Sequence, residues 1–148
     1  MKEIMVAIDG SEGSAAAIDE AVDLAGDLEA HMTFAYVRKP TSSLLGRPYY
    51  ECHLARDLGR ARATVDAAVR RAREAGLDAH GEILEGNPVD EILSFSDNAG
   101  ADLLVMGSRG HGAIAGTLLG SVSREVVQHA NVPVLVAKQA PRRKPKAA

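Results

Sequence analysis

Short apolar runs alternate along the chain with segments in which apolar residues recur every three or four positions. The runs predict strands buried on both faces, and they lie at residues 1–8, 31–37, 77–85, 102–106 and 132–138. The three-to-four spacing predicts four helices. The first begins after a cap at Ser11 or Ser14 and ends at Leu28, and the others lie at residues 51–75, 88–99 and 122–130. Five strands alternating with four helices indicate an α/β fold, with a parallel sheet covered by helices on both faces.

A glycine-rich segment separates the fourth predicted strand from the fourth predicted helix. Its glycines are Gly107, Gly110, Gly112, Gly116 and Gly120, and Ser121 and Ser123 follow them. Glycine lets the backbone approach a phosphate closely, and the first turn of a helix offers free N–H groups and a positive dipole end. The two serine hydroxyls can add donors. The segment therefore predicts an anion site; the alternative is a flexible loop with Ser121 as an ordinary helix cap.

The spacing of these glycines separates the loop from two common phosphate-binding motifs. A Walker A loop requires a Gly-Lys pair, and the chain contains none. The stretch from Gly110 to Ala115 nominally matches a dinucleotide fingerprint. That fingerprint belongs after the first strand of a long sheet, whereas here it follows the second-last predicted strand.

Gly107-x-x-Gly110, nine residues and then Gly120-Ser121 resemble the nucleotide loop of the universal stress protein family, in its ATP-binding branch. The opening VAIDGSEGS and the closing NVPVLVAK are similar to the same family, and the likeness covers about residues 2–138. The resemblance implies a Rossmann-like adenine-nucleotide-binding fold with strand order 3-2-1-4-5 and a homodimer through the last strand, Val132–Lys138. The chain departs from the family after the first helix, where Glu29 or Ala30 stands in place of the usual glycine.

The implied strand order places the first and fourth strands side by side. Ligands of open α/β sheets bind at the carboxyl ends of the strands where the order reverses. Asp9 follows the first strand. Its carboxylate could accept hydrogen bonds from ribose hydroxyls or help hold a divalent cation beside phosphates. The alternative role for Asp9 is to cap the first helix together with Ser11.

The resemblance extends the site to residues that are otherwise ordinary core positions. The backbone of Val37 would contact the adenine edge, Ala7 would pack on the base and Met106 would flank it. Arg109 is the loop cation that is best placed for phosphates. The candidate nucleotide-binding set is Ala7, Asp9, Val37, Met106, Gly107, Arg109, Gly110, Gly120, Ser121, Val122 and Ser123. The expected cofactor is ATP, with Mg²⁺ held through its phosphates near Asp9.

Composition and charge limit the possible partners. The 148 residues carry a net charge of −3, and a basic tail at residues 139–148 leaves the predicted domain, residues 1–138, more acidic still. An acidic body argues against a nucleic-acid partner, and the Pro- and Ala-rich tail is expected to be disordered. No apolar run approaches the roughly 20 residues of a membrane span, and no signal peptide is recognisable. The expected location is therefore the cytoplasm, and the single cysteine, Cys52, excludes a disulfide framework.

No catalytic set is recognisable among the motifs. The arginines of the second predicted helix, which include Arg56 and Arg60, are expected on a solvated face rather than in a phosphate patch. The favoured function is a cytoplasmic ATP-binding stress-response or signalling protein, a nucleotide-dependent switch with a partner that the sequence does not identify. The alternatives are a slow ATPase or nucleotide-transferring enzyme on the related nucleotide-hydrolase fold, and an interaction module without nucleotide.

Overall fold

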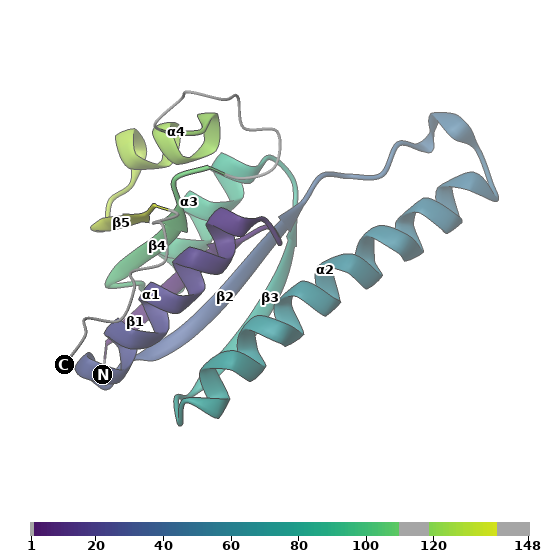
Figure 1. Cartoon of the computed structure of the whole chain (residues 1–148). Helices are drawn as coiled ribbons and strands as arrows, with labels where there is room; N and C mark the ends of the chain where they lie inside the picture. The colour runs from purple at the N-terminus through teal and green to yellow at the C-terminus, as the bar shows by residue number, and fades with distance from the viewer. Residues whose placement is uncertain (1, 110–118, 139–148) are drawn as a thin grey trace.

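The computed structural model describes residues 2–109 and 119–138, and its ten elements follow the predicted alternation (Figure 1). The predicted tail at residues 139–148 and the loop residues 110–118 lie outside the described residues. The elements are β1 (Glu3–Ile8), α1 (Glu12–Leu28), β2 (His31–Arg38), the 3₁₀ turn η1 (Ser43–Leu45), α2 (Tyr49–Glu74), β3 (Ala79–Glu85), α3 (Pro88–Asn98), β4 (Leu103–Gly107), α4 (Ser121–His129) and β5 (Val134–Ala137).

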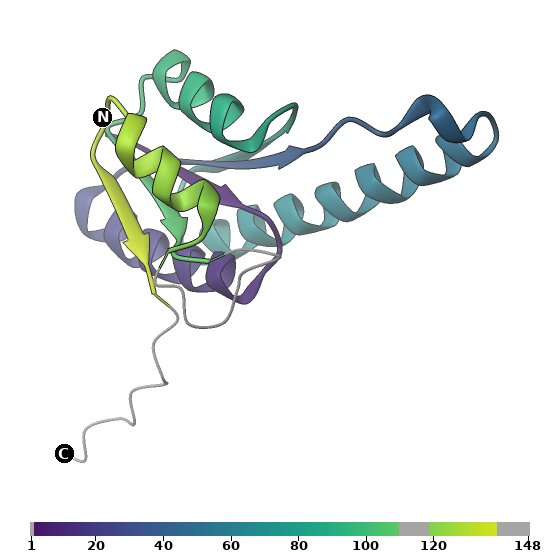
Figure 2. The same ribbon diagram turned by 90° about the horizontal axis from the view of Figure 1, so that it is seen from above.

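The five strands form one parallel sheet in the order β3-β2-β1-β4-β5, which confirms the predicted topology. Helices α1 and α2 pack on one face, and α3 and α4 cover the other, as the view along the sheet shows (Figure 2). Because the order reverses between β1 and β4, the carboxyl ends of β1, β2 and β4 surround the point where such sheets bind ligands.

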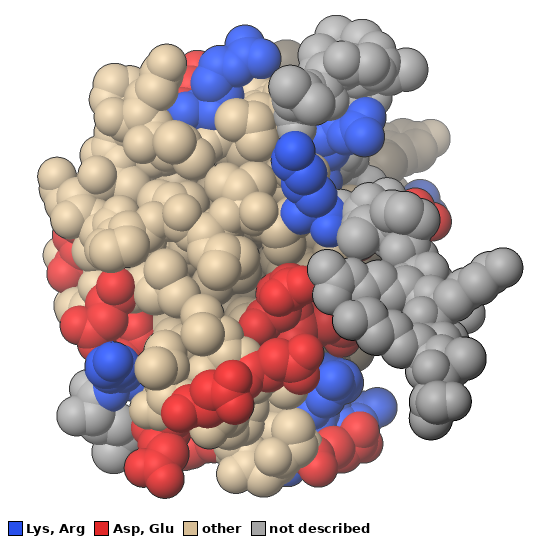
Figure 3. Space-filling model, turned by 60° about the vertical axis from the view of Figure 1, so that its left-hand side comes forward, with Lys and Arg blue, Asp and Glu red and all other residues tan. Residues whose placement is uncertain are grey.

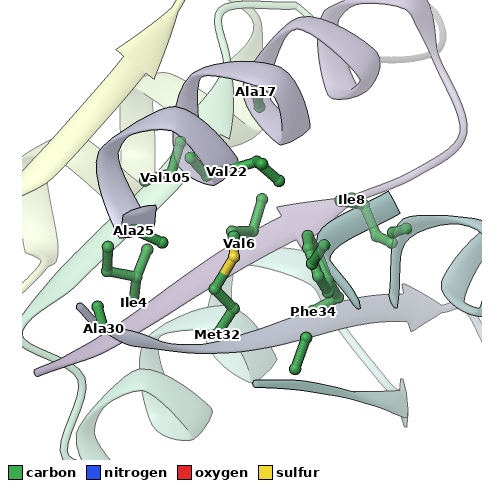
Figure 4. Packing of buried hydrophobic residues seen from close by; sticks show 14 of the residues in the cluster. Ile4, Val6, Ile8, Ala17, Val22, Ala25, Ala30, Met32, Phe34 and Val105 are labelled. Atoms are coloured by element: carbon green, nitrogen blue, oxygen red, sulfur yellow. The ribbon is translucent and has the colours of Figure 1, made fainter. Parts of the chain in front are cut away.

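Side chains on β1 alternate between two apolar cores. Ile4, Val6 and Ile8 pack toward α1 and α2, in a cluster that includes Phe34 (Figure 4). Met5 and Ala7 belong to the cluster that packs against α3 and α4. All five residues of β1 from Ile4 to Ile8 are buried, because both faces of a parallel sheet are covered.

The helix starts agree with local sequence chemistry. Ser11 caps α1 by accepting a hydrogen bond from the Ser14 amide at 3.2 Å, which decides between the two predicted caps. Asn87 caps α3, and Pro88 stands in its first turn. The Ser14 hydroxyl instead accepts from the Asp9 amide at 3.1 Å, and Ser14 is buried. The hydroxyls of Ser11 and Ser14 therefore both hold the turn between β1 and α1.

The end of α1 shows the departure from the family pattern. Glu29 takes a left-handed backbone conformation with φ of 51°, and its amide bonds back to carbonyls of the last turn. A side chain in this conformation costs roughly 1–2 kcal/mol, so the usual glycine would fit better. Gly26 stands inside α1 instead, exposed and with open space around it.

Two glycines set how closely α1 approaches β4. A Cβ on Gly107 would lie 2.6 Å from the carbonyl carbon and oxygen of Gly13. A Cβ on Gly13 would in turn overlap the carbonyl oxygen of Arg109. Neither glycine has a positive φ, so the requirement here is for space rather than for backbone freedom.

The first half of α2 and η1 extend beyond the sheet (Figures 1 and 2). The second half of α2 packs through Ala61, Val65, Ala68 and Ala72, and Gly81 of β3 lets Val65 come close. Leu44 is 95% exposed and Tyr49 is 65% exposed in the extended part. The sequence placed this helix correctly to within two residues but did not predict that half of it leaves the body.

Candidate functional site

A cavity of about 540 Å³ lies where β1, β2 and β4 end and α4 begins. Every residue of the predicted nucleotide-binding set that the structure describes lines this cavity. Gly110 belongs to that set but lies outside the described residues. The strand ends and the glycine loop, which are far apart in the sequence, therefore meet at one cavity at the switch point of the sheet.

One half of the cavity is apolar. Ala7, Val37 and Met106 come from the ends of β1, β2 and β4, and all three belong to the core on the α3 side of the sheet. Ile92 of α3 and Val122 of α4 complete this wall. We call these five residues the apolar half, and its flat strand ends and soft methionine suit a planar apolar group.

The other half of the cavity lies toward α1 and α2 and was not predicted. Successive strand residues point to opposite faces of a sheet, so Tyr36 and Arg38 flank Val37 on the α2 side. Tyr36 packs on the α1 and α2 core, which supports this placement. Lys39 follows Arg38, and Asp57 and Arg60 line the cavity from α2. We call Tyr36, Arg38, Lys39, Asp57 and Arg60 the basic half.

Asp9 stands between the two halves at the end of β1. One of its carboxylate oxygens accepts a hydrogen bond from the Ser11 amide at 2.9 Å. This contact agrees with the predicted role beside Ser11 at the start of α1. The half-buried Asp9 also lines the cavity. Its side chain can therefore hold the turn and face a ligand at the same time.

The residues at the start of α4 differ from their predicted arrangement. Gly120, and not Ser121, is the cap of α4, with φ of −70° and ψ of 167°. Its amide donates to the carbonyl of Ser108 at 2.7 Å. Gly120 has no side chain, so the first turn of α4 lacks the side-chain acceptor that Ser11 and Asn87 give to α1 and α3. The amides of this turn are therefore suited to an outside anion.

Ser123 has a structural contact that the sequence did not indicate. Its hydroxyl donates to the carbonyls of Gly107 at 2.8 Å and Ser108 at 3.2 Å, and the residue is 4% exposed. In this structure the Ser123 hydroxyl is therefore directed at backbone carbonyls and not into the cavity. The contact ties α4 to the end of β4, while Ser121 remains exposed at the cavity wall.

Four cationic side chains line the cavity. Arg38 is 8% exposed and bonds to Glu85 at 3.0 Å, the carbonyl of Lys39 at 3.1 Å and the hydroxyl of Thr41 at 3.4 Å. Arg109, Lys39 and Arg60 are exposed at the rim. Within the described part of the chain, the structure gives these three no ion pair. An anionic ligand would therefore meet cations that are not already neutralised.

Among residues 2–109 and 119–138 there is no group of three or more His, Cys, Asp or Glu side chains that could hold a metal ion. No helix in the same ranges combines the length and apolar character needed to cross a bilayer.

An open parallel α/β sheet with a cavity at its switch point defines a class of small ligand-binding domains. Residues 1–138 match the model of the universal stress protein family. The chain is 34% identical over 145 residues to universal stress protein YxiE of Bacillus subtilis, an alignment that covers 92% of this chain and 98% of the relative. The chain belongs to the universal stress protein family.

Solved structures extend this relationship to nucleotide complexes. A universal stress protein in complex with cAMP is 31% identical, with a TM-score of 0.69 and coverage of 94% of this chain and 98% of that chain. The universal stress protein from Archaeoglobus fulgidus in complex with dAMP is 25% identical, with a TM-score of 0.73 and coverage of 93% and 98%. Both of these similar proteins are described with an adenine nucleotide bound.

Proposed function

We propose that this universal stress protein binds ATP in the cavity at the ends of β1, β2 and β4 and acts as a nucleotide-dependent switch in stress signalling in the cytoplasm. The observation that carries the proposal is the meeting of the apolar half, Asp9, Arg109 and the start of α4 around one cavity. The cAMP and dAMP complexes of similar proteins support an adenine nucleotide as the ligand class.

Each part of the cavity suits one part of the nucleotide. Ala7 and Met106 offer apolar surfaces to the adenine ring, and the end of β2 at Val37 offers backbone groups to its edge. Asp9 accepts from ribose hydroxyls. The phosphates face Arg109, Gly120 and the first-turn amides of α4, where the helix dipole favours negative charge.

The proposal includes Mg²⁺ held together with the phosphates. The chain lacks the lysine of a Walker A loop, so Arg109 and the α4 amides would neutralise only part of the charge of a triphosphate. Asp9 is the carboxylate nearest to the proposed ribose and phosphate positions in the described lining, and hard cations prefer such oxygen ligands. A bound Mg²⁺ would supply the remaining charge neutralisation.

The outer edge of β5 suggests a second copy of the chain as a partner. The amide of Leu104 donates to the carbonyl of Pro133, and the amide of Ser108 donates to the carbonyl of Ala137. Alternate residues of β5 therefore bond to β4, and the backbone groups of Val134 and Val136 point to the open edge. Figure 3 shows a broad surface without charged side chains on the side of the molecule where β5 and α4 lie. Open apolar edges favour strand pairing, so we propose a homodimer through β5.

The test of nucleotide binding has two parts. Protein that is purified, heat-denatured and analysed by chromatography should release ATP, whereas release of ADP or AMP alone would favour the slow ATPase. Titration calorimetry should then give weaker ATP binding in the presence of EDTA. Equal affinity with and without Mg²⁺ would contradict the metal and shift the role to Arg109.

A substitution locates the phosphates. Gly120→Val should abolish ATP binding because the side chain would occupy the cavity wall, while φ of −70° allows the fold to persist. Gly59→Val is the matched control, because Gly59 lies on α2 with open space around it. Unchanged ATP affinity in folded Gly120→Val would contradict the phosphate assignment.

The dimer has its own test. Val136→Pro removes an N–H that points to the open edge, and proline is tolerated on edge strands. Light scattering should report a dimer for the parent and a monomer for the variant. A parent that remains monomeric well above micromolar concentration would contradict pairing through β5.

A further inference from the structure

The proposed ATP contacts leave the basic half of the cavity without a role. The adenine, ribose and phosphate positions use the apolar half, Asp9, Arg109 and the start of α4. Lys39 and Arg60 line the same cavity from the end of β2 and from α2. Neither has an ion pair with any residue that the structure describes, so two cations face the cavity against the single carboxylate of Asp57.

Arg38 makes this half of the cavity rigid. A guanidinium buried to this degree is costly unless it is paired, and Glu85 supplies the pairing charge from the end of β3. The remaining bonds of Arg38 hold the carbonyl of Lys39 and the hydroxyl of Thr41. The backbone that carries Lys39 is therefore fixed beside the cavity rather than free to turn away.

Two cationic groups, Arg109 on one hand and Lys39 with Arg60 on the other, lie on opposite sides of β1. Arg109 follows β4, whereas Lys39 follows β2, and β1 runs between these strands. Neighbouring strands are about 4.8 Å apart, so the ends of β2 and β4 are separated by roughly 10 Å. A nucleotide whose phosphates all extend from the 5′ carbon reaches Arg109 and α4 but leaves Lys39 and Arg60 without an anion.

We propose that the basic half is a second phosphate subsite and that the cavity takes a nucleotide phosphorylated at two positions, on the 5′ carbon and on a 2′ or 3′ ribose hydroxyl. This inference rests on the proposed nucleotide site. Asp9 lies at the end of β1, between the two cationic groups, where the ribose would stand. The second phosphate meets Lys39 and Arg60, and the other ribose hydroxyl remains available to Asp9.

The experiment compares three adenine nucleotides by titration calorimetry: AMP, ADP and adenosine 3′,5′-bisphosphate. ADP and the bisphosphate carry the same number of phosphates, but those of ADP all lie on the 5′ side. The bisphosphate should bind about tenfold more tightly than either of the others, which corresponds to one charge-assisted phosphate contact. An ADP affinity equal to or higher than that of the bisphosphate would overturn the second subsite.

Variants on α2 assign the effect to a residue. Arg60→Ala should remove the roughly tenfold advantage of the bisphosphate and leave AMP affinity unchanged. Arg56→Ala is the matched control, because Arg56 is also exposed on α2 and does not line the cavity. Lys39→Ala tests the same bisphosphate advantage with a residue that does not lie on α2. If the bisphosphate advantage survives both Arg60→Ala and Lys39→Ala, the subsite is wrong.

The outcomes separate this inference from the proposed function. Binding of AMP without any preference for the bisphosphate overturns the second subsite alone. Failure of all three nucleotides and of ATP to bind overturns the nucleotide site and the subsite together.

Discussion

Gly107→Ala tests whether the first glycine of the loop serves packing rather than phosphate binding. The added Cβ would lie 2.6 Å from the carbonyl carbon and oxygen of Gly13 and 3.1 Å from its Cα. These atoms are backbone at the start of α1, so no side-chain rotation relieves the overlap. Helix α1 would have to move away from β4, and overpacking of this kind costs about 1–3 kcal/mol.

The upper end of that range applies because Gly13 is itself packed against the backbone of Arg109. A loss of about 3 kcal/mol should lower the melting temperature by roughly 6–12 °C in a domain of this size. Urea denaturation followed by circular dichroism measures the free energy of unfolding directly. If Gly107→Ala unfolds within about 0.5 kcal/mol of the parent, the packing argument is wrong, since that is the usual range for surface substitutions.

Four further substitutions test local features by the same denaturation assay. Gly26→Ala should stabilise the protein by about 0.5–1 kcal/mol, because the site is helical, exposed and open; a loss of stability would refute this. Glu29→Gly should add about 0.5–1 kcal/mol by relieving the left-handed backbone, and no gain would mean that the conformation carries little strain. Ser123→Ala should cost about 1 kcal/mol through its lost hydrogen bonds, whereas Ser121→Ala, at an exposed position, should be neutral.

The fold could be predicted because its signals are local. The apolar runs identified all five strands, and the helical spacing placed the start of α3 at residue 88, where the structure has it. The strand order came from resemblance rather than from any pattern in the residues. The start of β3 was placed two residues early, because Leu77 packs against the core without joining the sheet.

Half of the cavity lining could be predicted, and the rest depends on tertiary placement. The predicted set comes from strand ends and the glycine loop, which sequence motifs mark. Tyr36 and Arg38 were missed because only Val37 of the second predicted strand was assigned to the site, and that strand was predicted to end at Val37. Arg60 was expected to face only solvent, and no local pattern reports that α2 crosses the end of β2 at this residue.

The glycines of the loop could be located from the sequence, but their individual contacts could not be predicted. Its spacing identified the position of the site, but it could not assign separate roles to individual glycines. Gly107 allows close packing against Gly13, whereas Gly120 caps α4 without supplying an acceptor. The packing role of Gly107 depends on Gly13, which lies far away in the sequence, so it follows from the folded structure alone.

The central claim is that the first turn of α4 holds phosphate, and Gly120→Asn tests it most directly. Asparagine is among the best helix caps, and the backbone at this position accepts any residue. Its side chain would bond the first-turn amides, stabilise the protein by roughly a few tenths of a kcal/mol relative to glycine and compete for the groups that the phosphates need. Calorimetric titration with ATP and Mg²⁺ should then show affinity reduced at least about tenfold in a protein that is more stable than the parent. Unchanged ATP affinity in the stabilised variant would contradict the claim.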